Sequence, residues 1–308
     1  MRFKDQSKMK AVTFSYDDGV TQDLRLIELL NKYNLKCTFN LNSELLGTRG
    51  TLERYGMKIS HYKLHPEDVR SVYEGHEIAV HTLTHPPLTR TSDEEIIRQV
   101  EQDRLNLSRL AGYEVVGMAY PCGGENNNDH VARIIKENTG VKYCRTIATN
   151  NSFDEQENLF RFNPTLFHLD FDEMTELGRR FVEMKPEKPQ ILYVWGHSYE
   201  MDYDSSYWTR LEEFFKLISG KNDTEEDAIS LAHLLTSAFR GTGAPIHVNL
   251  IRVNEVKETG YKSGTSESAN RFCDILNKNG CVATLRRRLG SDVNAACGQL
   301  RRSTKTDN

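Results

Sequence analysis

Two groups of residues in this chain have the types and spacing for metal-assisted acid–base chemistry. Asp17 and Asp18 are adjacent carboxylates followed by Gly19, and His81 and His85 are two imidazoles four positions apart. Two neutral imidazoles and one carboxylate form a usual three-ligand set of a catalytic zinc, which leaves one position open for water. The second carboxylate is then available as a general base. A cation between the Asp17 and Asp18 carboxylates would relieve their repulsion, which otherwise raises the pKa of one of them.

A third candidate is His197, which stands in Trp-Gly-His-Ser-Tyr directly after an apolar run. Its ordinary pKa suits a general acid near neutral pH. Taken alone, each group also has a structural interpretation: Asp is common in turns and helix N-caps, a His pair arises by chance, and a His after a strand can be exposed. The remaining histidines show no comparable context and are interpreted as structural or exposed: His61, His65, His76, His130, His168, His233 and His247.

These residues can act together only if strand ends position them. Short apolar runs at 11–16, 36–41, 77–81, 115–120 and 191–196 predict strands, and amphipathic stretches such as 21–33 and 208–219 predict helices. Ser92 and Glu95 have capping-box spacing and open another helix. The alternation predicts an α/β fold with a parallel sheet, open or closed into a barrel. In such folds the active site lies at the carboxyl ends of the strands, where each candidate stands.

Composition restricts the class of protein. The 308 residues are 38% hydrophobic and 27% charged, which is typical of a soluble globular protein, and the net charge of -4 calls for no nucleic acid. The six cysteines include no Cys-x-x-Cys, which indicates neither a zinc knuckle nor a redox motif. Six in 308 residues are too sparse for a disulfide scaffold, so a reducing compartment is the simpler interpretation. The N-terminal MRFKDQSKMK has no apolar run, and no apolar stretch reaches the roughly 20 residues of a membrane span. We expect a cytoplasmic protein without a membrane partner.

Four motifs carry a resemblance to a known family. TFSYDDG (13–19), HTLTHPPL (81–88), AYPCGG (119–124) and VWGHS (194–198) resemble, in order and spacing, the motifs of the polysaccharide deacetylases of carbohydrate esterase family 4. The match covers about residues 8–220. It implies a distorted (β/α) barrel and hydrolysis of N-acetyl or O-acetyl groups on carbohydrate polymers.

The resemblance also implies roles for individual residues. It assigns the divalent metal, usually zinc, to Asp18, His81 and His85. Asp17 would be the general base towards water whose pKa the metal lowers. The backbone N–H of Cys122 would help to hold the oxyanion, and His197 would protonate the departing amine.

The third motif departs from the family pattern, which usually reads Arg-x-Pro-Tyr. Here Ala119 stands at the Arg position and Cys122 at the Tyr position. The Arg that would tune the base is therefore missing from the motif, which leaves the pKa of Asp17 open. Cys122 is smaller than Tyr, so the wall of the pocket is reduced at this position. This favours a substrate other than a standard chitin-like polymer.

The tail resembles a different family. GKNDTEEDA (220–228), HVNLIRVN (247–254) and LGSDVNAACGQLR (289–301) are similar to the C-terminal portion of the radical-SAM enzymes that methylate an adenine of ribosomal RNA and tRNA at C2. The resemblance makes Cys297 the methyl-carrier position. The Cys-x-x-x-Cys-x-x-Cys of that family is absent, so we expect no iron–sulfur cluster, no use of S-adenosylmethionine and an inert Cys297. Arginines at 286–288, 301 and 302 could contact RNA phosphates weakly, but we do not expect nucleic acid as the main partner.

We therefore predict a deacetylase domain at 1–220 and a methyltransferase-like fragment at 221–308, joined as a chimera. The strand HVNLIRV is predicted to complete the barrel, because an open sheet edge is a liability. The leading function is a metal-dependent deacetylase of acetylated carbohydrate. The alternative is a fusion with an imperfectly closed barrel and little activity, whose basic tail is structural or binds RNA weakly.

Overall fold

The computed structural model describes residues 10–54, 56–219, 225–238, 246–250 and 265–285. The chain divides into two compact units, Met1–Gly220 and Lys221–Asn308, and each has a hydrophobic core of its own. Within the described residues, no helix combines the length and the apolar character that crossing a membrane requires.

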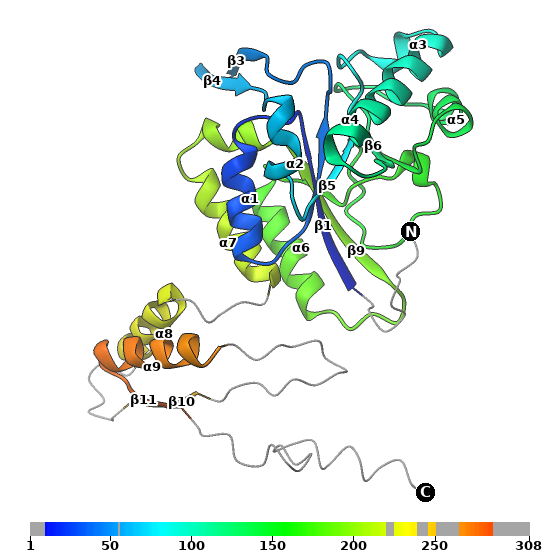
Figure 1. The fold of residues 1–308 in the computed structure, drawn as a ribbon. Helices are drawn as coiled ribbons and strands as arrows, with labels where there is room; N and C mark the ends of the chain where they lie inside the picture. Colours follow the sequence, from blue (N-terminus) through cyan, green and yellow to red (C-terminus); the bar gives the residue numbers. More distant parts are fainter. Residues whose placement is uncertain (1–9, 55, 220–224, 239–245, 251–264, 286–308) are drawn as a thin grey trace, which may run out of the picture. The chain divides into compact units, whose positions relative to one another are not determined.

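The N-terminal unit is built on one parallel sheet (Figure 1). The order of its strands is β7-β6-β5-β2-β1-β9-β8. Its strands are β1 (Lys10–Asp17), β2 (Cys37–Leu41), β5 (Glu77–Val80), β6 (Gly117–Ala119), β7 (Tyr143–Arg145), β8 (Leu166–Phe167) and β9 (Gln190–Gly196). Every residue of β2 is buried, as is typical of parallel strands covered on both faces. The central β1 pairs with β2 and β9, so the predicted site residues at their carboxyl ends share one edge.

The chain after β7 joins the two outer strands of this sheet. The N–H of Phe162 donates to the carbonyl of Cys144 at 2.9 Å, and the N–H of Thr146 donates to the carbonyl of Phe162 at 2.9 Å. Shortly afterwards β8 pairs with β9. The sheet thereby curls into a distorted barrel, which confirms the predicted fold class. The prediction that residues 246–252 complete the barrel is wrong, because within the described residues β10 (His247–Leu250) pairs with β11 (Val282–Leu285) instead.

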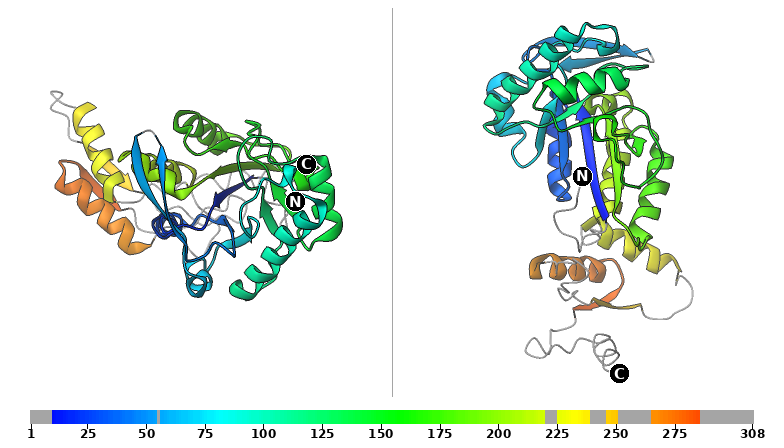
Figure 2. Two further views of the ribbon diagram at one scale, coloured as in Figure 1. Left: turned by 90° about the horizontal axis from the view of Figure 1, so that it is seen from above. Right: turned by 90° about the vertical axis from the view of Figure 1, so that its right-hand side faces the viewer.

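Helices cover the two sides of the sheet, with α1, α6 and α7 on one side and α3, α4 and α5 on the other (Figures 1 and 2). Their bounds are α1 (Asp23–Lys32), α2 (Val69–Val72), α3 (Asp93–Ile97), α4 (Asp103–Ala111), α5 (Asp129–Asn138), α6 (Phe171–Glu183) and α7 (Tyr207–Ser219). The π-helical segment η3 (Arg98–Gln102) runs from α3 into α4, and the 3₁₀ segments are η1 (Pro66–Asp68), η2 (Leu88–Arg90), η4 (Leu159–Arg161) and η5 (Ser198–Tyr203). The Ser92 side chain accepts a hydrogen bond from the Glu95 N–H and caps α3 as predicted. Capping orients the first turn by satisfying an otherwise unpaired donor.

An antiparallel hairpin of β3 (Arg49–Arg54) and β4 (Met57–Tyr62) was not predicted from the sequence. Its Ile59 packs with Val20, Tyr199 and Tyr203 in a small apolar cluster. The hairpin therefore lies against the segments that follow β1 and β9. This placement brings His61, on β4, towards the end of β1.

The C-terminal unit contains α8 (Glu225–Ala238), β10, α9 (Ser266–Lys278) and β11. The strands β10 and β11 are parallel, and Ala228, Ala232, Phe272 and Leu276 form most of the buried core. Cys297 and the arginines at 286–288, 301 and 302 lie outside the described residues.

Candidate active site

The end of β1 presents two carboxylates at the carboxyl edge of the sheet. Asp17 is the last residue of the strand, and Asp18 has a left-handed backbone with φ of 85°. Gly19 follows with φ of 63°, and a Cβ there would lie 2.7 Å from Leu41 Cδ2. Only glycine fits this turn without strain. Because of this turn, the Asp18 carboxylate contacts Lys63 and His61, whereas the Asp17 carboxylate contacts Arg145.

Asp18, His81 and His85 come together at this edge. One ligand atom from each lies within 4.8 Å of the others. Thr82 and His85 have left-handed backbones with φ of 69° and 62°, so the His-x-x-x-His pair lies on a turn and not on a helix. The His85 N–H donates to Thr82 Oγ1 at 3.1 Å and closes this turn.

Both imidazoles are held neutral. His81 Nδ1 lies 2.9 Å from the carbonyl oxygen of Ala119, so Nδ1 carries the hydrogen and Nε2 is left to bind a metal. Burial lowers the pKa of His81 to about 4. Burial also lowers the pKa of His85. Neutral imidazole is the form that ligates a metal ion.

The Asp18 carboxylate is ionised and held by two side chains from the hairpin region. Lys63 Nζ lies 3.1 Å from Oδ1, and His61 Nε2 lies 3.2 Å from Oδ2. Burial opposes the charge, but Lys63 and then His61 outweigh it and hold the pKa of Asp18 well below its usual range. An ionised carboxylate and two neutral imidazoles at this spacing fit a divalent cation. His61, which the sequence gave no reason to single out, thus supports a candidate ligand.

Asp17 forms a buried ion pair with Arg145, a residue that sequence reasoning missed. Arg145 is 0% exposed, and its Nη2 lies 2.5 Å from both carboxylate oxygens. Burial opposes the charge of Asp17, but Arg145 outweighs it and lowers the pKa. Arg145 is the register partner of Ala119 on the neighbouring strand. The conclusion that no Arg tunes the base is therefore wrong, because β7 supplies the guanidinium that the third motif lacks.

His197 lies on the other side of Asp17. Its Nε2 is 3.9 Å from Asp17 Oδ2, and its Nδ1 is 3.0 Å from Glu200 Oε2. Burial lowers the pKa of His197, but Glu200 outweighs it and raises the pKa to about 9. His197 is therefore a cation at neutral pH, with Nε2 directed towards the carboxylate edge.

A second histidine, His168, also contacts Glu200, and it is fully buried. Of the two interpretations given to it from the sequence, structural or exposed, the burial of His168 agrees with the first. Its Nε2 lies 2.8 Å from Glu200 Oε2. The spacing of His197 and Glu200, three residues apart, was the available sequence signal for this cluster.

Cys122 lies beside the candidate metal ligands. Its backbone is left-handed, with φ of 68°, and its N–H donates to His85 Nε2 at 3.4 Å. Its Sγ lies 3.5 Å from the carbonyl oxygen of His85. The N–H predicted to hold an oxyanion therefore borders the same edge as Asp18 and His85.

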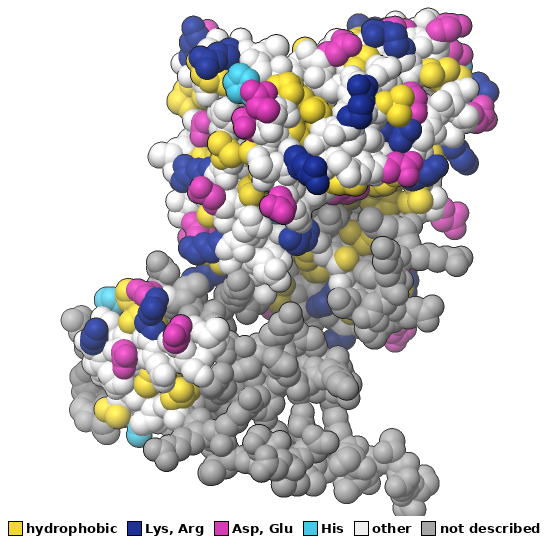
Figure 3. Space-filling view, viewed as in Figure 1, with side chains coloured by type: hydrophobic (Ala, Val, Ile, Leu, Met, Phe, Trp, Pro, Cys, Tyr) yellow, Lys and Arg dark blue, Asp and Glu magenta, His cyan; other side chains and the backbone are white. Residues whose placement is uncertain are grey.

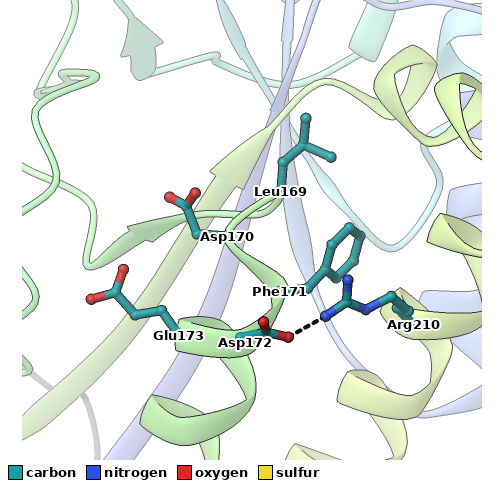
Figure 4. Close-up of a pocket in the computed structure, with 6 residues that line it drawn as sticks. All are labelled: Leu169, Asp170, Phe171, Asp172, Glu173 and Arg210. Carbon is teal, nitrogen blue, oxygen red and sulfur yellow. Dashed lines mark hydrogen bonds and ion pairs between the residues drawn. The ribbon is translucent and has the colours of Figure 1, made fainter.

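A separate surface hollow is lined by Leu169, Asp170, Phe171, Asp172, Glu173 and Arg210 (Figure 4). Arg210 is paired with Asp172 there. None of the predicted site residues lines this hollow, so it adds no group to the chemistry described above.

Comparison with known proteins divides the chain in two. Residues 4–143 match the family model described as polysaccharide deacetylase. Among solved structures, the Streptococcus pyogenes deacetylase PplD in complex with acetate is 19% identical, with a TM-score of 0.40 over 48% of this chain and 61% of its own. A family 4 carbohydrate esterase from Streptomyces lividans in complex with acetate is 12% identical, with a TM-score of 0.43 over 68% of this chain and 88% of its own.

The C-terminal part matches a different group. A probable dual-specificity RNA methyltransferase RlmN of Clostridium perfringens (strain 13 / Type A) is 52% identical over 89 residues, which are 29% of this chain. The chain spans only 24% of that relative's length. An RlmN of Lachnoclostridium phytofermentans is 31% identical over 226 residues, 68% of this chain and 58% of its own, an alignment longer than the C-terminal unit. The chain thus joins a segment that matches the polysaccharide deacetylase family model to a C-terminal segment similar to RlmN-type RNA methyltransferases.

Proposed function

We propose that the N-terminal unit is a metal-dependent hydrolase that removes acetyl groups from N-acetylated or O-acetylated carbohydrate. The observation that carries the proposal is the arrangement at one strand edge. His197 Nε2 lies 3.9 Å from Asp17 Oδ2. Beside them, Asp18, His81 and His85 gather their ligand atoms within 4.8 Å. The deacetylase family match over residues 4–143 supports the same reaction class.

In this proposal Asp18, His81 and His85 would hold the divalent cation, which we predict to be zinc. When bound, such an ion polarises an acyl oxygen and lowers the pKa of water. Lys63 and His61 keep Asp18 ionised and oriented. The Ala119 carbonyl fixes the tautomer of His81.

Asp17 and His197 then perform the proton transfers. Asp17 is ionised at neutral pH because Arg145 offsets its burial, so it can accept a proton from the attacking water. His197 carries a proton on Nε2 and can deliver it to the amine or alcohol that departs. The backbone N–H of Cys122 would serve the oxyanion by exchanging its present acceptor, His85 Nε2, for the substrate oxygen.

We infer that the C-terminal unit, with a domain boundary near residue 220, contributes no radical chemistry, because the chain has no Cys-x-x-x-Cys-x-x-Cys. The RlmN similarity supports one alternative, in which the fusion has little activity and its tail binds RNA weakly. On the face in view in Figure 3, acidic and basic side chains of the N-terminal unit are interspersed. This mixture of charges does not favour the binding of a polyanion such as RNA to that face. Filter binding of RNA at rising salt concentration tests the alternative, since phosphate contacts weaken with salt.

Acetate release from acetylated amino-sugar oligomers tests the proposed reaction. Asp17→Asn and His197→Gln should each lose most of the release, because a general acid or base contributes roughly 10²–10⁴-fold. Asp129→Asn is the matched control, because among the described residues the Asp129 carboxylate forms an exposed ion pair with Arg161. Equal release by Asp17→Asn and Asp129→Asn would contradict the proposal.

A further inference from the structure

His168 lies behind His197 and shares a carboxylate with it. It is 0% exposed, and its Nε2 lies 2.8 Å from Glu200 Oε2. The same oxygen lies 3.0 Å from His197 Nδ1 and accepts from the His197 backbone N–H at 3.1 Å. One carboxylate oxygen therefore receives three hydrogen bonds, and two of them come from imidazoles.

Hydrogen-bond chemistry fixes the proton on each of these atoms. Burial opposes the charge of Glu200, but His197 and His168 outweigh it and hold the pKa of Glu200 well below its usual range. An ionised carboxylate only accepts hydrogen bonds, so His168 Nε2 and His197 Nδ1 must both carry hydrogen. Burial lowers the pKa of His168. Its Nδ1, 3.1 Å from Tyr16 Oη, then accepts from the hydroxyl.

Packing keeps the His168 ring in this orientation. A Cβ on Gly196 would lie 2.2 Å from His168 Cδ2, so the strand backbone is in close contact with the ring. The rings of Tyr16 and Phe167 lie 5.2 Å and 5.0 Å from it, centroid to centroid. A flipped ring would turn carbon towards Glu200 and leave a buried carboxylate short of a donor, which is costly.

We propose that His168 is a positioning residue for the general acid, His197. As a neutral Nε2–H donor, His168 fixes the Glu200 carboxylate. That carboxylate accepts from His197 Nδ1–H and so keeps His197 Nε2 facing Asp17. The role in catalysis rests on the proposed function. The tautomers do not depend on it.

NMR spectra of the full-length chain with ¹⁵N-labelled histidine test the tautomers without any substrate. Long-range ¹H–¹⁵N correlations should show His168 as the Nε2–H tautomer on both sides of the ordinary His pKa of about 6.5. His197 should show hydrogen on both nitrogens. Spectra of His168→Gln assign the resonances. An Nδ1–H tautomer or a cationic His168 would overturn the proposal.

Kinetics then test the positioning role. His168→Leu removes the donor, whereas His168→Gln retains an N–H that can reach Glu200. We expect the Leu variant to lose about tenfold or more in kcat with little change in KM, and the Gln variant to recover part of that loss, because a misplaced general acid forfeits part of its roughly 10²–10⁴-fold contribution. Equal losses in the two variants would overturn the proposal. His76→Leu is the control, since His76 is buried outside the site against Phe39.

If the wild type releases no acetate, the proposed function fails, and the NMR result still decides whether His168 holds Glu200 as stated.

Discussion

Replacing Arg145 by Met would leave the Asp17 carboxylate buried without its main cation. The side chains of Arg145 and Asp17 are 0% and 2% exposed, and two contacts of 2.5 Å join them. In the described structure the carboxylate would keep a hydrogen bond from Asn40 Nδ2 at 2.8 Å and the more distant His197 at 3.9 Å.

The contacts of Arg145 set the expected loss in the free energy of unfolding. Breaking a buried ion pair by removing one partner costs about 3–5 kcal/mol, because the other charge stays desolvated. Arg145 also donates to Ser15 Oγ at 3.0 Å and to the Thr146 carbonyl at 3.1 Å, so two acceptors lose a donor as well. The retained bond from Asn40 offsets part of this. We expect a loss of about 4 kcal/mol in the free energy of unfolding of the N-terminal unit.

Urea unfolding followed by tryptophan fluorescence measures this loss. The chain has two tryptophans, Trp195 and Trp208, and both belong to the N-terminal unit, so the signal reports that unit. A chelator keeps the metal state constant. Arg161→Met is the control, because its ion pair with Asp129 is exposed and worth at most about 1 kcal/mol.

Equal losses in Arg145→Met and Arg161→Met would refute the reasoning. The double variant Asp17→Asn with Arg145→Met should lose less than the sum of the single variants, since neither charge then stays buried alone. Strict additivity would show that the two side chains do not act as a pair.

Three further predictions concern the acid, the strand that carries it and the second unit. Burial lowers the pKa of His197, but Glu200 raises it to about 9, so kcat should fall as the pH rises through about 9. A pH–rate profile in which kcat falls near the ordinary His pKa would contradict this. Gly196→Ala should destabilise the N-terminal unit by about 1–3 kcal/mol, because its Cβ would lie 2.2 Å from His168 Cδ2. Gly123→Ala, with nothing within 4 Å of the added atom, should stay within about 0.5 kcal/mol in the same urea assay. A chain ending at Gly220 should keep its metal uptake by equilibrium dialysis, because every candidate ligand precedes that residue. Lost uptake with an intact fold would show that the second unit is required.

Strand ends were the most predictable part of this protein. Parallel strands covered on both faces read as short apolar runs, so the positions of Asp17, His81 and His197 after such runs located one edge of the sheet. The cap at Ser92 was predictable for a similar reason, since side-chain and backbone partners lie within four residues of each other.

Residues that depend on strand order were not predictable. Arg145 lies 128 residues from Asp17 in sequence and belongs to a strand of three residues, too short for a recognisable pattern. Its pairing with Ala119 shows why the Arg seemed to be missing from the third motif. The bridge between Phe162 and Arg145 was not predictable either, because an isolated bridge leaves no periodic signal in the sequence.

Other predictions stay open. The cytoplasmic location stays a prediction from the sequence, and the sequence names acetylated carbohydrate only as a class. Cys297 lies outside the described residues. The predicted inertness of this thiol therefore rests on the absence of the cluster-binding cysteines from the sequence.

The most direct test of the account is acetate release before and after removal of metal. The wild-type chain, freed of metal by a chelator and checked for residual metal, is assayed on acetylated amino-sugar oligomers and again after zinc is added back. The account predicts that release is lost with the metal and returns as one zinc binds per chain at the group formed by Asp18, His81 and His85. Release that continues unchanged in the metal-free chain would contradict it.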